Sequence, residues 1–285
     1  RQGDSCKIAL GAKKCTELIK LELNPQTISS NLCLDTTIGN RPAIIAAFYS
    51  AAALIQRVFA DEMDIVPEEL EITEVRVDPI TNIPVIYLND SLVNGSGFVN
   101  MLVSSYVDAT GTPYTTMLEY IFNRIVNFQG TFMASIKAHA SSCHTSCVKC
   151  LQTFYNAGYH HVLDWRLGVD IINLMLDTSY DMGFASGLTT PYADLKDVID
   201  LAGTNTASAH NGVSYNSTMM ELTDSGIVKK IIHPLWRNSG TDLNTFDLFR
   251  IGYESDPLTS LFPAPPVSSS PGSPTYATTT GSVII

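Results

Sequence analysis

The alternation of polar and apolar residues predicts strands in the N-terminal half of the chain. Residues 16–23 alternate with a period of two, the pattern of a half-buried strand, and residues 70–79 and 83–90 are predicted to form two further strands. Turn-forming residues, including Asp78-Pro79 and Asn82, separate the last two segments. These two segments are therefore expected to pair as an antiparallel hairpin.

Apolar residues at helical spacing predict several helices between these strands and residue 177. The first begins at Arg41-Pro42 and is rich in alanine, so another element could approach it closely. A long helix is expected over 114–140, interrupted only by Gly130, and a shorter one over 98–107. An amphipathic helix follows over 161–177.

The C-terminal third is more polar, and its elements are shorter. The predicted elements are a short helix over 194–203, a loop over 205–218, a strand over 226–236 that ends at Pro234, and a segment over 242–253 that fits a strand or a short helix. Residues 263–285 contain no charged side chain and are rich in Pro, Ser, Thr and Gly, which is typical of a linker or flexible tail.

The charge balance argues against tight binding of nucleic acid by this chain alone. Seventeen Lys and Arg stand against 28 Asp and Glu, a net charge of −11. Neutralisation of phosphates by Lys and Arg supplies most non-specific affinity for nucleic acid, and an acidic surface lacks it. The sequence contains no uncharged apolar run of the ~18 residues that a membrane helix needs, so we expect a cytoplasmic protein with no membrane partner.

Three cysteines close together predict a metal site. Cys143, Cys147 and Cys150 follow the spacing C-x3-C-x2-C in a polar stretch, whereas the remaining three cysteines are scattered. Zinc is held by four tetrahedral ligands in structural sites, and thiolates and imidazoles are the usual ones. One coordination position is then left to fill.

The fourth ligand is expected to be His160, which lies just ahead of the next helix. His161, His144, Asn156 and a distant cysteine are weaker candidates for the same position. The sequence contains neither H-E-x-x-H nor the H-x-E and P-C-x-x-C pair of zinc deaminases. We therefore expect a closed structural zinc site and no catalytic residues in this chain.

The fold expected from these elements is α+β, with long helices packed on a mainly antiparallel sheet and a small zinc-binding loop between two helices. Residues 1–190 are expected to form the main domain, with the zinc cluster at 143–160. Residues 191–262 would continue the same domain as a strand-rich closing segment. The tail begins at 263.

The cysteine run and the segment after it resemble a known family. Cys143, Cys147 and Cys150-Leu151, followed by Tyr159-His160 and Leu163-Asp164-Trp165-Arg166-Leu167, resemble the MZB-type cysteine-rich C-terminal domain of bacterial superfamily-two helicases. The family includes repair helicases of the MrfA and Hrq type and phage-defence proteins of the DISARM or Druantia type. Weaker matches are 16–19, the alanine-rich helix, 87–98 and 233–236, so the resemblance extends over roughly residues 15–250.

This resemblance implies an accessory domain that braces a DNA helicase or translocase. The partners would be the rest of a helicase chain or a helicase subunit, with DNA bound through the full assembly and ATP only in the parent protein. Because the chain begins at Arg1 and ends in an apolar run, we expect it to be a piece of a longer protein. In the repair helicases a fourth cysteine holds the zinc, and its position falls on Asn156 here.

Two further functions stay open at the level of sequence. Asp78, Asp90, Asp170 and Asp177 could form the metal site of a nuclease or another hydrolase, although no paired-carboxylate motif organises them. A protein-docking module of a defence complex would suit the acidic surface.

The residues beside the cluster have competing interpretations. We expect Asp164 to cap a helix and Trp165 to pack the zinc loop on the core. Arg166 either pairs with a carboxylate or, with Lys149, contacts nucleic-acid phosphates. His233 is expected to be a packed strand end rather than a base, and the glycine turn at 94–97 a tight turn rather than an anion site.

Overall fold

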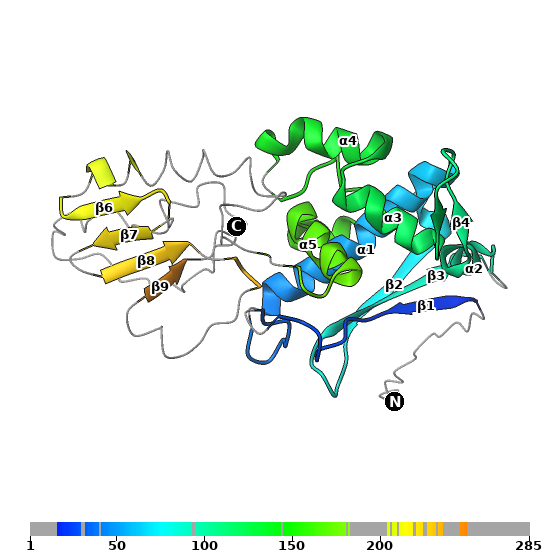
Figure 1. The fold of residues 1–285 in the computed structure, drawn as a ribbon, viewed down its shortest axis with the longest axis horizontal. Coiled ribbons are helices and arrows are strands. Elements are labelled where there is room, and N and C mark those ends of the chain that lie inside the picture. Colours follow the sequence, from blue (N-terminus) through cyan, green and yellow to red (C-terminus); the bar gives the residue numbers. More distant parts are fainter. Residues whose placement is uncertain are drawn as a thin grey trace, which may run out of the picture.

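Helices and mainly antiparallel strands make up the fold, as the sequence predicts for an α+β protein (Figure 1). The structure is a computed structural model that describes residues 16–29, 32–39, 41–92, 95–143, 145–180, 182, 204–205, 207–209, 211–218, 221–224, 227–231, 233–235 and 246–249. The α-helices are α1 (Arg41–Met63), α2 (Phe98–Val103), α3 (Met117–Val126), α4 (Gly130–His139) and α5 (Trp165–Leu176). Short 3-10 helices are η1 (Pro67–Glu69), η2 (Ala140–Ser142) and η3 (Ala157–Val162).

The strands form three sheets. They are β1 (Leu18–Leu21), β2 (Leu70–Val77), β3 (Pro84–Asp90), β4 (Tyr106–Val107), β5 (Pro113–Tyr114), β6 (Val213–Asn216), β7 (Glu221–Asp224), β8 (Ile227–Ile231) and β9 (Phe246–Phe249). The first sheet has the order β1-β3-β2 and is antiparallel throughout, which confirms the three predicted strands and the hairpin. Strands β4 and β5 pair separately, and the third sheet has the order β6-β7-β8-β9.

Helix α1 is the centre of the hydrophobic core. One side of it lies on β2 and β3, and α3, α4 and α5 pack around the rest (Figure 1). By length and composition α1 could cross a membrane, yet 78% of its most apolar 18-residue window is buried inside the protein. Phe48, Leu54 and Phe59 are fully buried there. The apolar surface of α1 is thus covered by the protein's own elements.

The long helix expected over 114–140 is two helices, so this prediction is wrong. Pro113–Tyr114 forms β5, and α3 begins only after Thr116, whose hydroxyl accepts the amide of Glu119. Helix α3 ends at Val126 because Phe128 has φ 52° and Gly130 has φ 86°, both in the left-handed region. Helix α4 then starts in a new direction.

Helices α1 and α5 cross closely where both carry small residues. A Cβ atom on Gly168 would lie 2.8 Å from the backbone carbon of Ser50 and 2.9 Å from the amide nitrogen of Ala51. The Ser50 hydroxyl also accepts the amide of Asp164, at 2.7 Å. The alanine-rich helix therefore allows the close approach that its composition suggested.

Gly168→Ala should lower the free energy of unfolding by about 2–3 kcal/mol, because the added methyl meets backbone that cannot move aside. Urea denaturation measures the loss. Gly158→Ala is the matched control, since a Cβ at Gly158 meets no atom within 4 Å. Equal stability of the two variants would show that the crossing is looser than described.

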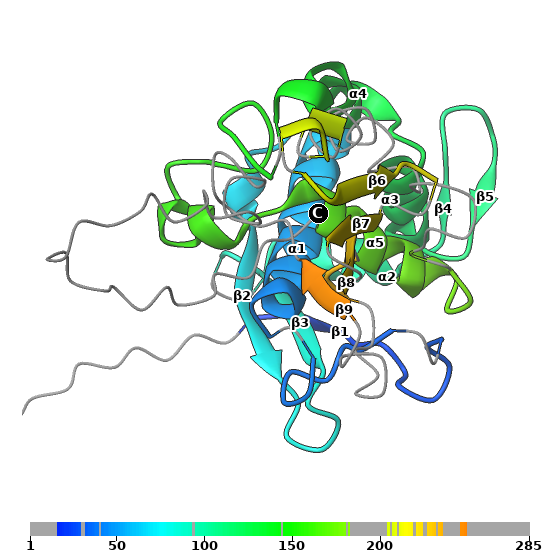
Figure 2. The ribbon, with the colours of Figure 1, turned by 90° about the vertical axis from the view of Figure 1, so that its left-hand side faces the viewer.

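The C-terminal sheet corrects the predicted boundaries of this region. The expected loop over 205–218 contains β6, and β7 lies in a segment for which no strand is predicted. Strand β8 confirms the strand predicted over 226–236, and β9 lies in the ambiguous segment 242–253, parallel to β8. Figure 2 looks toward this sheet. The helix predicted at 194–203 and the tail at 263–285 lie outside the described residues.

The short segment after β8 is anchored in the main core. His233 Nδ1 accepts the amide of Leu235, so its Nε2 carries the proton and donates to Asp170 Oδ2, 2.8 Å away. Leu235 is fully buried, and its carbonyl accepts the amide of Cys33. The interpretation of His233 as a packed strand end is confirmed by its burial.

Candidate metal centre

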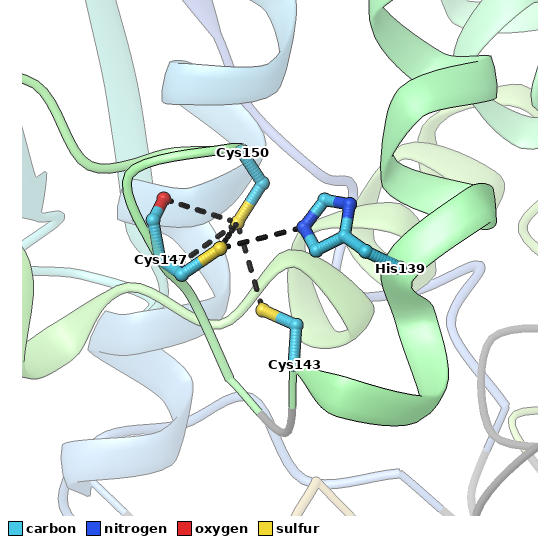
Figure 3. A group of neighbouring side chains, drawn as sticks. All are labelled: His139, Cys143, Cys147 and Cys150. Atoms are coloured by element: carbon cyan, nitrogen blue, oxygen red, sulfur yellow. Dashed lines mark hydrogen bonds between the residues drawn. The ribbon is translucent and has the colours of Figure 1, made fainter.

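Four side chains from one short stretch of chain point toward a common centre (Figure 3). His139 is the last residue of α4, Cys143 follows the 3-10 turn η2, and Cys147 and Cys150 lie in the metal loop, which we define as residues 143–163. Their ligand atoms all lie within 4.8 Å of one another. The predicted zinc cysteines are thus brought together, with a histidine beside them.

The distances within this cluster fit a tetrahedral zinc ion. Cys150 Sγ lies 3.7 Å from Cys143 Sγ and 3.8 Å from Cys147 Sγ, and His139 Nε2 lies 3.4 Å from Cys147 Sγ. A zinc ion with Zn–S bonds of about 2.3 Å and Zn–N bonds of about 2.0 Å would separate two sulfurs by about 3.8 Å and sulfur from nitrogen by about 3.5 Å. The donor set and its spacing therefore suit a closed four-ligand site.

The backbone orients His139 for this role. Its Nδ1 hydrogen-bonds the carbonyl oxygen of Ser135, one turn earlier in α4. A carbonyl only accepts, so Nδ1 carries the proton and Nε2 presents its lone pair to the sulfurs. Metal-binding histidines are commonly fixed in this way by a hydrogen bond from the other ring nitrogen.

The thiols of Cys143 and Cys150 do not ionise alike. Hydrogen bonding from Cys143 lowers the pKa of Cys150 to about 5, and the Cys147 amide, 3.0 Å away, also donates to its sulfur. The same hydrogen bond, together with burial, raises the pKa of Cys143. Cys150 thus becomes a thiolate at lower pH than Cys143, and a divalent metal would displace the protons that remain when it binds.

His160 is not the fourth ligand, so this prediction is wrong. Its Nε2 lies 2.8 Å from the carbonyl oxygen of Thr153 and 2.9 Å from Oδ1 of Asn156, within the turn that precedes η3. The imidazole is therefore used to close the metal loop on itself. His139, on the other side of the cysteines, is the histidine that the structure brings to the cluster, so it is the candidate for the fourth ligand.

The weaker candidates for the fourth ligand do not join the cluster either. Asn156 accepts the amide of Thr153 and donates to the carbonyl of Leu151, which makes it a turn residue. Cys33 is buried elsewhere, with its Sγ 4.0 Å from the carbonyl of Asp35. His161 is not among the clustered ligands, and His144 lies outside the described residues.

A spacing signal for His139 was present in the sequence. His139 precedes Cys143 by four residues at the end of a predicted helix, so H-x3-C continues the C-x3-C-x2-C pattern upstream. A ligand before the first cysteine is thus as compatible with the spacing as one after the last. The bend that η2 introduces between His139 and Cys143 brings the two side chains together.

Arg166 fastens the metal loop to the helical core. It is 1% exposed, and its guanidinium donates from Nη1 to the carbonyl of Cys143 at 2.6 Å and from Nη2 to that of Ala140 at 2.9 Å. It also lies 4.2 Å from the ring centroid of Trp165, whose indole donates to the Cys143 carbonyl. Of the two interpretations of Arg166, the possible contact with nucleic acid is wrong, because its guanidinium is inside the protein.

The remaining residues beside the cluster are placed as follows. Asp164 caps α5 by accepting the amides of Arg166 and Leu167, and Trp165 is buried against the loop, so both interpretations are confirmed. Lys149 is exposed on the metal loop. Its contact with a phosphate stays a prediction.

Asp164 should make stability depend on pH. Burial raises the pKa of its carboxyl to about 7, from an ordinary value near 3.8. Because the pKa is raised in the folded state, the protonated carboxyl of Asp164 favours folding. This contribution to the free energy of unfolding is complete below about pH 4 and is lost as the pH rises through 7. Asp164→Asn keeps the capping oxygen and removes the charge. The stability of this variant relative to wild type should therefore rise by about 3–4 kcal/mol between pH 4 and 8 in urea titrations. A difference that does not change with pH would contradict this assignment.

Among the described residues, the aspartates considered for a nuclease site are not grouped around a shared metal position. Asp78 and Asp177 accept hydrogen bonds from neighbouring turn residues. The carboxylate of Asp170 accepts hydrogen bonds from the imidazole of His233 and the hydroxyl of Tyr180. In the part of the chain that the structure describes, the cysteine–histidine cluster is the one group of His, Cys, Asp and Glu found close enough for a metal.

The side chain of Asp90 accepts the backbone amides of the glycine turn before α2. Asp90 is fully buried, and its carboxylate accepts the amides of Ser96, Gly97 and Val99 at 2.7–3.0 Å. Gly97 has φ 86°, which explains the glycine at that position. The backbone amides that could have met a phosphate are therefore occupied, and the tight-turn interpretation is confirmed.

Comparison of the chain with protein-family models, curated proteins and solved structures gave no match. The metal centre is therefore assigned from its own donor atoms. Their number, spacing and orientation are those of a site that holds a metal ion with a thiolate and imidazole shell.

Proposed function

We propose that this chain is a non-catalytic accessory domain, stabilised by a structural zinc ion, of a DNA helicase or translocase, or of its partner, in repair or anti-phage defence. The observation that carries the structural part is the closed Cys3His set of His139, Cys143, Cys147 and Cys150. Four protein ligands leave no coordination position for water, whereas a catalytic zinc keeps one open.

The position of the metal centre supports a structural role. The ion would join the end of α4 to the metal loop, while Arg166 and Trp165 hold the same loop on α5. Helices α4 and α5 are thereby fixed relative to each other. Holding chain segments together in this way is what a structural zinc contributes to folding.

The helicase assignment draws on the resemblance of the cysteine run and the Leu163–Leu167 segment to MZB-type domains. The cap at Asp164, the packed Trp165 and the internal Arg166 give that shared segment a physical role in holding the zinc loop. The helicase motor, its ATP and the DNA path would belong to the parent protein or to a partner, and the domain would work in the cytoplasm.

The zinc assignment is tested by metal content in two histidine variants. After washing with a weak chelator, elemental mass spectrometry should find one zinc per chain in wild type and in His160→Ala. His139→Ala should lose the ion or hold it at least about tenfold more weakly. The opposite pattern, with zinc lost only in His160→Ala, would restore the ligand set first expected from the sequence.

The accessory role is tested by adding the chain to its parent helicase or partner subunit. Unwinding by the motor should require the zinc-loaded domain, and the isolated domain should neither cleave DNA with added Mg²⁺ or Mn²⁺ nor hydrolyse ATP. The alternative is that the domain is a nuclease. It would be established if the isolated domain cleaved DNA and a single change at Asp90 or Asp170 abolished the cleavage with the fold intact.

A further inference from the structure

The three cysteines of the metal centre differ in how far solvent reaches them. Cys143 is 4% exposed and Cys150 is fully buried, whereas Cys147 is only partly buried. The two residues after Cys147 are exposed, and Val148 among them is 80% exposed. A small solute can therefore approach the sulfur of Cys147, while the other two sulfurs are shielded by the protein.

A β-turn holds Cys147 and Cys150 within range of a disulfide bond. The carbonyl of Cys147 accepts the amide of Cys150 at 3.0 Å, so the two cysteines are the first and fourth residues of the turn. Such a turn places their Cα atoms less than about 7 Å apart, and a disulfide joins Cα atoms about 4.4–6.8 Å apart. Their sulfurs lie 3.8 Å apart (Figure 3). Small rotations of the two side chains are enough to bring the sulfurs together.

Cys143 is less suited to form the bond, although its sulfur is 3.7 Å from that of Cys150. Both of these cysteines are buried, so an oxidant reaches neither of them first. The backbone of Cys143 is also fixed, because its carbonyl accepts hydrogen bonds from Arg166 and Trp165. The pair most ready to react is therefore Cys147 with Cys150.

We propose that Cys147 is a site of reversible oxidation by peroxides, at which a disulfide to Cys150 forms and the metal ion is released. This inference concerns the regulation of the metal centre and rests on the proposed structural zinc, but it requires no helicase. In a reducing cytoplasm such a bond would be transient, as disulfides that report on oxidants are.

The reaction has two steps and consumes one hydrogen peroxide. The thiolate sulfur of Cys147 attacks a peroxide oxygen, the O–O bond breaks, and a sulfenic acid forms while hydroxide leaves. The thiolate sulfur of Cys150 then attacks the sulfenic sulfur; the S–S bond forms, the S–O bond breaks and a second hydroxide leaves. Both hydroxides take protons from solvent and become water. The two sulfurs lose two electrons, and these reduce the peroxide.

The disulfide would take two of the four ligands from the metal. A disulfide sulfur carries no charge, and zinc is held by thiolates, so only His139 and Cys143 would remain to bind it. The ion would then leave, and the connection between the end of α4 and the turn would open. Because this disulfide closes a very short ring, it adds little stability and thiols can reduce it, after which zinc can bind again.

The test follows zinc and disulfides in the same sample. Cys6, Cys15 and Cys33 are changed to serine, so that the cluster holds the only thiols of the chain. Hydrogen peroxide is added to the zinc-loaded protein without thiols. A chromogenic chelator measures the zinc released, and mass spectrometry after alkylation maps the disulfide. One zinc should be released for each Cys147–Cys150 bridge, and dithiothreitol with added zinc should restore the original zinc content.

Two histidine variants separate the roles of the cysteines. Cys147→His and Cys143→His both retain four ligands of a type that zinc accepts. Cys143→His keeps the reactive pair and should release zinc at a rate within about twofold of the parent protein, whereas Cys147→His lacks the accessible thiol and should release it at least about tenfold more slowly. Zinc content before oxidation shows whether each variant is loaded. If either variant binds no zinc, the disulfide mapped in the parent protein decides the question.

Three results would overturn the proposal. They are retention of zinc in the presence of peroxide, a mapped bridge between Cys143 and Cys150, and equal rates of zinc release from the two histidine variants. Each of them leaves the metal centre itself intact, since the sample holds zinc before peroxide is added. A protein that never holds zinc would contradict the metal centre, and with it this proposal.

Discussion

Cys150→Ser is expected to cause the largest loss of stability of any single substitution in this chain. Cys150 is fully buried, its sulfur lies within 3.8 Å of the other two, and the hydrogen bond from Cys143 lowers its pKa to about 5. Zinc binding in small metal sites contributes about 10–16 kcal/mol, comparable with the whole free energy of unfolding of a domain, about 5–15 kcal/mol. Packing changes in the core contribute less.

The measurement is thermal unfolding with and without a strong chelator. Without chelator, the wild-type chain should melt at a higher temperature than Cys150→Ser. Chelator should lower the Tm of the wild type nearly to that of Cys150→Ser, and it should leave the Tm of the variant unchanged. Cys33→Ser is the matched control, since Cys33 is a buried free cysteine outside the cluster. It should stay sensitive to chelator. A Cys150→Ser protein with the wild-type Tm would contradict the structural role of the metal.

Arg166→Met is expected to cost about 3–5 kcal/mol, the second largest effect. The change leaves the buried carbonyls of Cys143 and Ala140 without their charged donor and removes the contact with the Trp165 ring. Such a loss is a large part of a typical domain's stability. The metal loop should be released from α5 as a result.

Two controls make the Arg166 result specific. Arg76→Met removes a guanidinium from an exposed pair with Glu74 and should change the free energy of unfolding by at most about 0.5 kcal/mol. Arg166→Lys keeps the charge but lacks the forked donors, so it should recover only part of the loss. A larger effect at Arg76 than at Arg166 would show that the guanidinium does not hold the loop.

Local patterns in the sequence determined the first sheet, the start of α5 and the cluster of cysteines that could hold a metal ion. The two segments 70–79 and 83–90 predict a hairpin because turn-forming residues separate them, and the structure pairs them as the antiparallel strands β2 and β3. The Asp164 cap is equally local, since its partners are two and three residues away. Three cysteines within eight residues also indicate a site, because thiolates so close together need a shared cation.

The tertiary structure alone decided between candidates that the sequence leaves equivalent. His139 and His160 both lie near the cysteines in sequence, but the 3-10 turn after α4 carries His139 to the sulfurs, whereas the Thr153–Asn156 turn takes the His160 imidazole. Arg166 could have been an exposed cation, and only the folded chain places two carbonyls at its guanidinium. Which histidine reaches the cysteines, and whether Arg166 is buried, depends on which backbone segments come together in the folded protein. The pattern of polar and apolar residues along the chain does not predict those contacts.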